Sequence, residues 1–418
     1  MNILMMTNTY LPYVGGVATS VAAFTDDLRQ RGHHVVVVAP EYDEAPDDEP
    51  DVIRLPAIQH FTGGDFSVIV PIHSALHNRL EDFKPDIVHC HHPYLIGSTA
   101  VRVAKKFDLP LVYTQHTMYE QYTHYVPVGS EKLKEFVVNL STGYSNMADM
   151  VIAPSDSIAE IIRRRGVQTP IEVIPTGIDI KQFAAGSGQA LRQEFDIVPD
   201  AWVVGHLGRL APEKNLDFLS EAVAAFLLKE PRAHFVVVGY GPSQKPMNEF
   251  FTRKGLQDRV HFAGKRKGRK LSDAYHAMDV FAFSSKSETQ GLVVAEAMAC
   301  GVPVVALDAP GVREVVTDGV NGYLLSREDS AAFADALARF FSAASDTKKQ
   351  FGTQARQTAE QFTTDKCVSR LLAVYEQLHK KGIARRHKDE TAWEKLTEHI
   401  KTEWELLTNI TDAIGDSL

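Results

Sequence analysis

Short apolar runs alternate with helical patterns along almost the whole 418-residue chain, and this alternation limits the possible folds more than any other feature. Most runs are continuous and rich in β-branched residues, which is typical of parallel strands covered on both faces. The first half contains the runs 3–7, 34–40, 86–91, 111–116 and 150–155, and the second contains the runs 202–210, 234–241, 260–265, 280–285 and 302–307. We therefore predict an α/β protein with two parallel sheets.

The pattern begins again around IEVIPTGIDIKQF (171–183), where a new glycine-turn sequence follows. A chain of this length also favours two domains. We predict an N-terminal domain at 1–172, a C-terminal domain at 173–360 and terminal helices at 361–418. The expected architecture is two doubly wound, Rossmann-like domains that face a central cleft. Ligands then bind outside the carboxyl ends of the strands.

Two helical patterns follow the second domain. The apolar spacing of 357–382 suits a helix that packs on a domain, and we expect the first terminal helix to pack back on the N-terminal domain. The last segment, 391–418, is amphipathic, with apolar residues at helical steps at Trp393, Leu396, Ile400, Trp404 and Leu407. It is interpreted either as a packed terminal helix or as an interfacial or oligomerisation helix.

Composition excludes several classes of protein. A net charge of −9 argues against nucleic acid as a partner. Cys90, Cys300 and Cys367 are scattered without metal spacing, which fits a reducing compartment and no disulfide framework. The N-terminus lacks a basic signal region, and no apolar run approaches the roughly 20 residues of a membrane span. We expect a cytoplasmic protein, or one peripheral to the inner face of a membrane.

The segment SSKSETQGLVVAEAMACGVPVVA (284–306) places Glu288 and Glu296 on either side of Gly291, which opens an apparent helix. A helix N-terminus after a glycine offers free backbone N–H groups to an anion. The two acids are suited to accept hydrogen bonds from sugar hydroxyls on either side of a phosphate. A nucleotide-sugar has this layout. The alternative is an ordinary capped helix with Glu296 on a solvated face.

Two further loops follow strands. In GHLGRLAPEKN (205–215), Arg209 and Lys214 lie five residues apart, and two cations on one such loop suit a diphosphate. The alternative is a pair of ordinary surface cations. Near the N-terminus, Gly15 and Gly16 lie between a strand and a helix and allow the backbone to approach a ligand closely, although a structural turn explains them equally well.

The segment TQHTMYEQYTHYVP (114–127) begins at a strand's carboxyl end, so His116 is expected at the cleft. A His at such a position is also often a satisfied core residue. Polar aromatic side chains have a flat apolar body and a polar tip, and they bind sugars and amphipathic headgroups well. We therefore predict an acceptor site formed by Tyr119, Glu120, Tyr122, His124 and Tyr125.

The segments TNTYLPYVGGVATSV, HTMYEQYTHY, IPTGID, GRLAPEKN and ETQGLVVAEAMACGVPVV together resemble retaining glycosyltransferase family four, of GT-B fold, over roughly residues 1–380. The resemblance implies a nucleotide-sugar donor in the C-terminal domain and an acceptor in the N-terminal domain. It implies the following donor contacts: Arg209, Lys214 and the backbone of Gly291 and Leu292 to the diphosphate, Glu296 to the ribose, Glu288 and His116 to the hexose, Gly16 to the donor phosphate, and Lys265 to the nucleobase.

Within that family, HTMYEQYTHYVP and SETQGL are similar to bacterial 1,2-diacylglycerol 3-glucosyltransferases, which implies transfer of glucose from UDP-glucose to a membrane lipid. The stretch 132–147 and the Arg163–Arg165 cluster are candidates for contact with an anionic membrane. We expect no metal cofactor, because no persuasive D-x-D motif is present. The alternatives are the same chemistry on a soluble sugar, sugar phosphate or hydroxy acid, and a GT-B-like nucleotide-sugar epimerase or binding protein.

Overall fold

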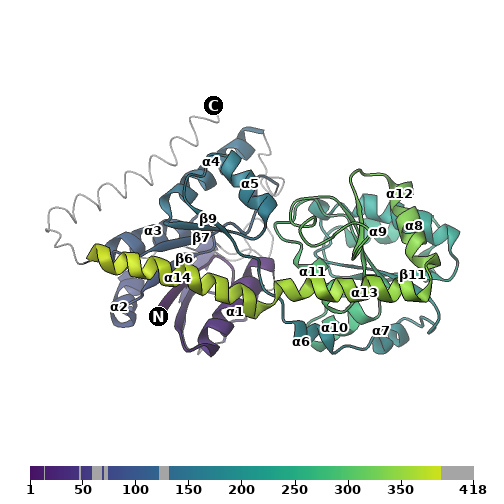
Figure 1. Ribbon diagram of the computed structural model, residues 1–418, viewed down its shortest axis with the longest axis horizontal. Coiled ribbons are helices and arrows are strands. Elements are labelled where there is room, and N and C mark those ends of the chain that lie inside the picture. Colours follow the sequence, from purple (N-terminus) through teal and green to yellow (C-terminus); the bar gives the residue numbers. More distant parts are fainter. Residues whose placement is uncertain (14, 47–48, 59–67, 70–73, 122–130, 387–418) are drawn as a thin grey trace. The chain divides into compact units, whose positions relative to one another are not determined.

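A computed structural model describes the chain except for residues 14, 47–48, 59–67, 70–73, 122–130 and 387–418 (Figure 1). Two compact units are present: Met1–Gly177 with Thr364–Leu418, and Ile178–Thr363. The boundary predicted at residue 172 falls inside strand β9 (Ile171–Val173), which pairs with β8 of the first sheet. The first unit therefore extends to Gly177, because its last strand completes that sheet. The amphipathic segment predicted at 391–418 lies outside the described residues.

The first unit contains a seven-stranded parallel sheet of order β3-β2-β1-β6-β7-β8-β9 and a small antiparallel pair, β4-β5. Its strands are β1 (Asn2–Met6), β2 (His34–Pro40), β3 (Val52–Leu55), β4 (Ala57–Ile58), β5 (Val68–Ile69), β6 (Ile87–Cys90), β7 (Leu111–Thr114), β8 (Met150–Ala153) and β9. Its helices are α1 (Gly16–Gln30), α2 (Ser74–Phe83), α3 (Ile96–Lys106), α4 (Glu131–Met147), α5 (Asp156–Arg164) and α14 (Thr364–Arg386).

Alternate residues of β1 enter two different cores of this unit. Ile3 and Met5 pack with α1 and α14, whereas Leu4 and Met6 pack with α2, α3, α4 and α5. Side chains alternate across a strand, so a sheet covered on both faces needs apolar residues at every position. This explains why the strands read as continuous apolar runs.

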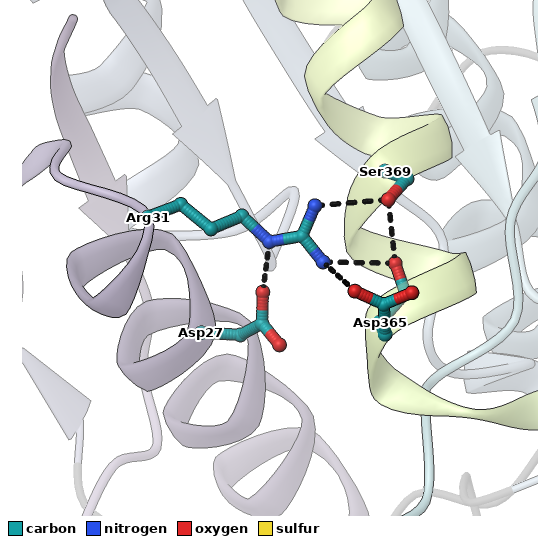
Figure 2. Close-up of polar contacts among 4 residues, drawn as sticks. All are labelled: Asp27, Arg31, Asp365 and Ser369. Carbon is teal, nitrogen blue, oxygen red and sulfur yellow. Dashed lines mark hydrogen bonds and ion pairs between the residues drawn. The ribbon is translucent and has the colours of Figure 1, made fainter.

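Helix α14, at the yellow end of the colour scale in Figure 1, packs against α1 in the first unit. Its buried residues recur at helical spacing at Cys367, Val368, Leu371, Val374, Tyr375 and Leu378. Beside this stripe, Arg31 donates to Asp365 Oδ1 at 2.8 Å and to Ser369 Oγ at 2.9 Å, and it pairs with Asp27 of α1 (Figure 2). A packed apolar stripe and a polar clasp thus hold the C-terminal helix on the N-terminal sheet.

The second unit contains a six-stranded parallel sheet of order β12-β11-β10-β13-β14-β15. Its strands are β10 (Trp202–Leu207), β11 (Ala233–Val238), β12 (Val260–Gly264), β13 (Val280–Phe283), β14 (Val304–Leu307) and β15 (Gly322–Leu325). Its helices are α6 (Ile180–Ala184), α7 (Gln189–Glu194), η3 (Pro212–Lys214), α8 (Leu216–Lys229), α9 (Gln244–Arg253), η4 (Gln257–Arg259), α10 (Arg269–His276), α11 (Leu292–Ala299), α12 (Ser330–Ser342), α13 (Ser345–Ala359) and η5 (Glu360–Phe362).

Helices also cover both faces of this sheet. One core contains residues of α8, α9 and α12, and the other contains residues of α6, α7, α10 and α11. The two doubly wound parallel sheets predicted from the sequence are confirmed. In each sheet the strand order reverses once, between β1 and β6 and between β10 and β13. Ligands of such sheets bind outside the carboxyl ends of the strands at this switch point.

Candidate active site

At the switch point of the second unit, the segments that follow β10 and β13 are joined by hydrogen bonds. Ser284 Oγ, after β13, donates to the carbonyls of Lys214 and Asn215 at 3.0 Å each, and Ser287 Oγ donates to the carbonyl of Glu213 at 3.1 Å. These bonds hold the turn after β10 against the segment that carries Glu288. The two loops therefore form one rigid edge.

An ion pair lies at this edge. Lys214 Nζ donates to Glu288 Oε1 at 2.6 Å, and the two side chains are only 16% and 17% exposed. Burial alone would raise the pKa of Glu288, but Lys214 and a hydrogen bond from Ser285 lower it below its usual value. Glu288 is therefore an ionised acceptor at neutral pH. The structure thus brings together two predicted donor residues that are 74 positions apart.

The N-terminus of α11 begins at Leu292, directly after Gly291. Gly291 has φ +70°, a left-handed conformation that favours glycine, and a Cβ there would lie 3.0 Å from the carbonyl oxygen of Gly311. The first amides of α11 precede its first intrahelical hydrogen bond, and its first turn carries no acidic residue. This end of the helix is therefore electropositive and suits an anion.

Glu296 lies on α11, one turn beyond these amides. Tyr275 of α10 donates its hydroxyl to Glu296 Oε2 at 2.7 Å. Burial raises the pKa of Glu296 to about 7, although the Tyr275 hydrogen bond lowers it. Glu296 is thus partly buried and held by an aromatic hydroxyl, unlike the solvated position of the alternative interpretation.

Two other predicted cations are exposed. Arg209 follows β10, and Lys265 follows β12. Lys265 Nζ lies 4.7 Å from the centroid of the Tyr240 ring, which is 57% exposed. Tyr240 lines an open pocket of about 520 Å³ together with Gly241, Pro242, Gln244, Lys245, Asn248 and Phe262. Lys265 therefore borders a hollow with an aromatic wall.

In the first unit, histidines occupy the carboxyl ends of β6 and β7. His91 Nδ1 lies 2.9 Å from His116 Nε2, and His91 Nε2 lies 3.4 Å from Met5 Sδ. A thioether sulfur can only accept, so we assign the proton of His91 to Nε2 and let His116 donate to His91 Nδ1. Burial lowers the pKa of His116 to about 3 and holds the pKa of His91 well below its usual value. Both rings are therefore neutral.

Gly16 is the first residue of α1 and is exposed. A Cβ placed on it would meet no atom within 4 Å. The protein's own packing therefore does not require glycine at this position.

The predicted acceptor residues are described only in part, because Tyr122, His124 and Tyr125 lie outside the described residues. The Tyr119 ring packs edge-on against Tyr94 at 4.8 Å, and Glu120 pairs with Arg165 at 2.8 Å. The small cavity that these two residues line holds about 10 Å³, which is room for roughly one water molecule. Tyr119 and Glu120 are thus engaged within the unit, and their role in acceptor binding stays a prediction.

Two family models match the chain: Glycosyltransferase Family 4 over residues 14–182 and Glycosyl transferases group 1 over residues 188–358. The chain is 30% identical to alpha-monoglucosyldiacylglycerol synthase of Acholeplasma laidlawii over 345 residues, which are 79% of this chain and 86% of that protein. It is 33% identical to D-inositol 3-phosphate glycosyltransferase of Xylanimonas cellulosilytica over 72% of this chain and 74% of that protein.

The chain belongs to glycosyltransferase family 4. It is 30% identical to GDP-mannose-dependent alpha-mannosyltransferase of Mycobacterium tuberculosis as well, over 77% of this chain and 83% of that protein. The crystal structure of HepE from Anabaena with UDP matches 90% of this chain and all of that chain, with a TM-score of 0.71 at 23% identity, and it shows the GT-B fold alone.

The family 4 enzyme described here is a retaining hexosyltransferase with a nucleotide-sugar donor. In the part of the chain that the structure describes, no group of three or more His, Cys, Asp or Glu side chains suits a metal ion. No helix among those residues is long and apolar enough to cross a bilayer.

His91 and Tyr275 are among the residues that touch predicted site residues and that sequence reasoning missed. His91 lies in the run HCHH (89–92) at the end of β6, and this run is a signal that could have been used. Tyr275 has no local signal, because it reads as an ordinary apolar position of α10 until α11 packs beside it.

Proposed function

We propose that this enzyme transfers glucose from UDP-glucose to a hydroxyl of a membrane lipid such as diacylglycerol, with retention of the anomeric configuration. The part of this proposal that concerns the donor rests on the Lys214–Glu288 ion pair beside the α11 N-terminus. This edge combines a buried cation, free helix amides and an ionised acceptor, as an anion attached to a sugar requires.

Each of these groups has a role in the proposed reaction. As the bond between sugar and phosphate breaks, negative charge grows on the leaving diphosphate. Lys214, Arg209 and the amides near Gly291 and Leu292 stabilise that charge, and such preorganised groups act most strongly where water is excluded. Glu288 accepts hydrogen bonds from the hexose, and Glu296 accepts them from the ribose. Lys265 contacts the nucleobase, while the contacts predicted for His116 and Gly16 stay predictions.

We further propose that the reaction needs no metal ion, since fixed cations neutralise the diphosphate. Activity is then expected to persist in excess EDTA. A complete loss of turnover on chelation, restored by a divalent ion, would overturn this part of the proposal.

The lipid half of the proposal is supported by helices α4 and α5. On α4, Phe136, Val137 and Val138 are only half-buried, while Lys132 is exposed. On α5, Arg163 and Arg164 are exposed. Val137 and Val138 line the same small cavity as Arg165, so the half-buried apolar face and the basic cluster belong to neighbouring helices. Such a surface suits an anionic bilayer, where each Lys or Arg contributes about 1 kcal/mol.

Transfer to a soluble acceptor is the second candidate, favoured by the 33% identity to the D-inositol 3-phosphate glycosyltransferase. The deciding experiment supplies UDP-glucose, GDP-mannose and UDP-N-acetylglucosamine with either diacylglycerol in vesicles or inositol 3-phosphate. The product is then partitioned between organic and aqueous phases. Label in the organic phase supports the lipid acceptor, and label confined to a new aqueous glycoside assigns a soluble one.

Sedimentation with anionic vesicles tests the surface directly. The wild type is expected in the pellet at low salt and in the supernatant at high salt, because salt screens surface charges. Reversal of charge at Arg163 and Arg164 should release it, whereas reversal at the exposed Lys229 of the second unit is the matched control. If the wild type stays in the supernatant at low salt and forms no glycolipid, the soluble acceptor is the better assignment.

A further inference from the structure

Tyr275 is fixed in the core of the second unit. Its side chain is fully buried, and its ring packs against Phe183 and Phe281, each with a centroid distance of 5.9 Å. The ring therefore has one available position. A buried tyrosine hydroxyl needs a hydrogen-bond partner, and the carboxylate of Glu296 is that partner at 2.7 Å.

The bond uses only one oxygen of Glu296. Within the described residues, the Tyr275 hydroxyl donates to Oε2, and no side chain or amide donates to Oε1. Glu296 is partly exposed, and Oε1 is not among the buried atoms that lack a partner. One oxygen is thus held by the protein, and the other remains accessible to a ligand.

We propose that Tyr275 is a positioning residue for donor binding: its hydroxyl holds one oxygen of Glu296, so that the other oxygen accepts the ribose hydroxyls. This inference rests on the ribose contact proposed for Glu296. It adds a residue of α10 that acts through α11 and does not touch the donor itself.

The charges around Glu296 are few. Helices α6 and α13 and strands β13 and β14 pack against α11. The charged residue of α6, Lys181, is exposed, and Arg356 of α13 donates to the carbonyl of Cys300. Strands β13 and β14 carry no titratable side chain, and the Cys300 thiol, directly after α11, interacts electrostatically with Glu296. Among these groups only the Tyr275 hydroxyl counters the effect of burial on Glu296.

The protonation state of Glu296 then couples donor affinity to pH. Burial raises the pKa of Glu296 to about 7, and the Tyr275 hydrogen bond lowers it. A protonated carboxyl group loses acceptor capacity, so affinity for the ribose falls as the pH falls through 7. Without the hydroxyl the pKa rises, and this loss of affinity begins at a higher pH.

The test is titration of UDP into the wild type and into Tyr275→Phe between pH 6 and pH 9, with GDP in parallel because the ribose is common to both. At pH 7 the variant should bind UDP about tenfold more weakly, since loss of the hydrogen bond to the carboxylate raises the pKa of Glu296 and leaves less of it ionised. At pH 9 the difference should shrink to the cost of the lost positioning, because Glu296 is ionised in both proteins. The phosphate's own ionisation, near about 6, is the same in all titrations and does not affect the comparison.

Two further variants separate the possible failures. Glu296→Gln should bind UDP weakly, and its affinity should not change with pH near 7. An unchanged affinity in this variant would contradict the proposed contact between Glu296 and the ribose. If Glu296→Gln behaves as expected but Tyr275→Phe keeps the wild-type pH profile, only the role of Tyr275 is wrong. Tyr144→Phe is the matched control, because it removes a buried hydroxyl bonded to the Gly97 carbonyl in the first unit. It should leave the UDP profile unchanged.

Discussion

At the switch point of the second unit the side chains are charged, whereas the same edge of the first unit's sheet carries neutral histidines. Lys214 and Glu288 pair at 2.6 Å, while His91 and His116 share one proton at 2.9 Å. The sheets have the same winding, so the backbone does not determine this difference. The residues that follow each strand determine it, as expected if one unit holds a diphosphate and the other an uncharged part of the substrates.

Burial acts in opposite directions on these two sets of groups. In the first unit, burial lowers the pKa of His89, His92 and His116 to about 3 each, which keeps them uncharged. In the second, the partner charge of Lys214 overcomes burial and keeps Glu288 ionised. At these two edges, the group that keeps its charge is therefore the one in contact with an opposite charge.

The largest effect is expected from removal of the Lys214 cation, which makes the charged edge of the second unit different from the histidine edge of the first. We expect Lys214→Met to lower kcat by roughly 10²–10³-fold, the usual cost of losing one preorganised group that stabilises transition-state charge. Lys229→Met is the control, since that lysine is 62% exposed and pairs with Asp335. Steady-state kinetics with UDP-glucose measure both variants, and a loss of less than about threefold in Lys214→Met would contradict the assignment.

Acidification should lower the stability of the first unit, because its buried histidines stay neutral in the folded state. Their folded pKa values lie below the unfolded value of 6.5, so the unfolded chain binds more protons as the pH falls below 6.5. The free energy of unfolding is thus unaffected by these histidines above about pH 6.5 and falls as the pH drops toward 3. The fall is up to about 1.4 kcal/mol per pH unit for each histidine that stays neutral in the folded state.

Urea unfolding at pH 7.5, 6.5 and 5.5, with hydrogen exchange to locate the opening, measures this decline. Peptides from 86–116 should lose protection on acidification. A free energy of unfolding that is flat between pH 7.5 and 5.5 would show that these histidines take up protons in the folded state.

Gly16→Ala should change stability and activity in opposite directions. Because a Cβ there meets no atom within 4 Å, Gly16→Ala should stabilise α1 slightly, by up to about 0.5–1 kcal/mol. If the donor phosphate borders this position, KM for the donor should rise roughly tenfold, since small displacements of reacting groups are costly. Thermal melting measures the change in stability, and steady-state kinetics measure KM for the donor. An unchanged KM would contradict the prediction that Gly16 borders the donor phosphate.

The smallest effect concerns the clasp in Figure 2. Arg31→Ala removes the contacts to Asp365 and Ser369, and Asp365 is 84% exposed, so the free energy of unfolding should fall by only about 1 kcal/mol. Donor kinetics should not change. A much larger loss would show that the clasp, and not the buried stripe of α14, holds this helix in place.

The sequence by itself determined the two wound sheets and the placement of Gly291 at the start of α11. Both follow from local rules: apolar runs define strands that are covered on two faces, and a left-handed residue before a helix favours glycine. The predicted boundary at residue 172 lies a few residues before the end of the first unit at Gly177, because short strands such as β9 carry too little pattern to assign to one sheet. The segments that hold Tyr122, His124, Tyr125 and the terminal amphipathic pattern lie outside the described residues.

Only the tertiary structure decided which side chains meet. Tyr275 and Glu296 are 21 residues apart, His91 and His116 are 25 apart, and Lys214 and Glu288 are 74 apart. Their pairing depends on how helices and loops pack over the strand ends, and no local spacing encodes that packing. The same packing buries these groups, and burial together with the partner sets which of them are charged.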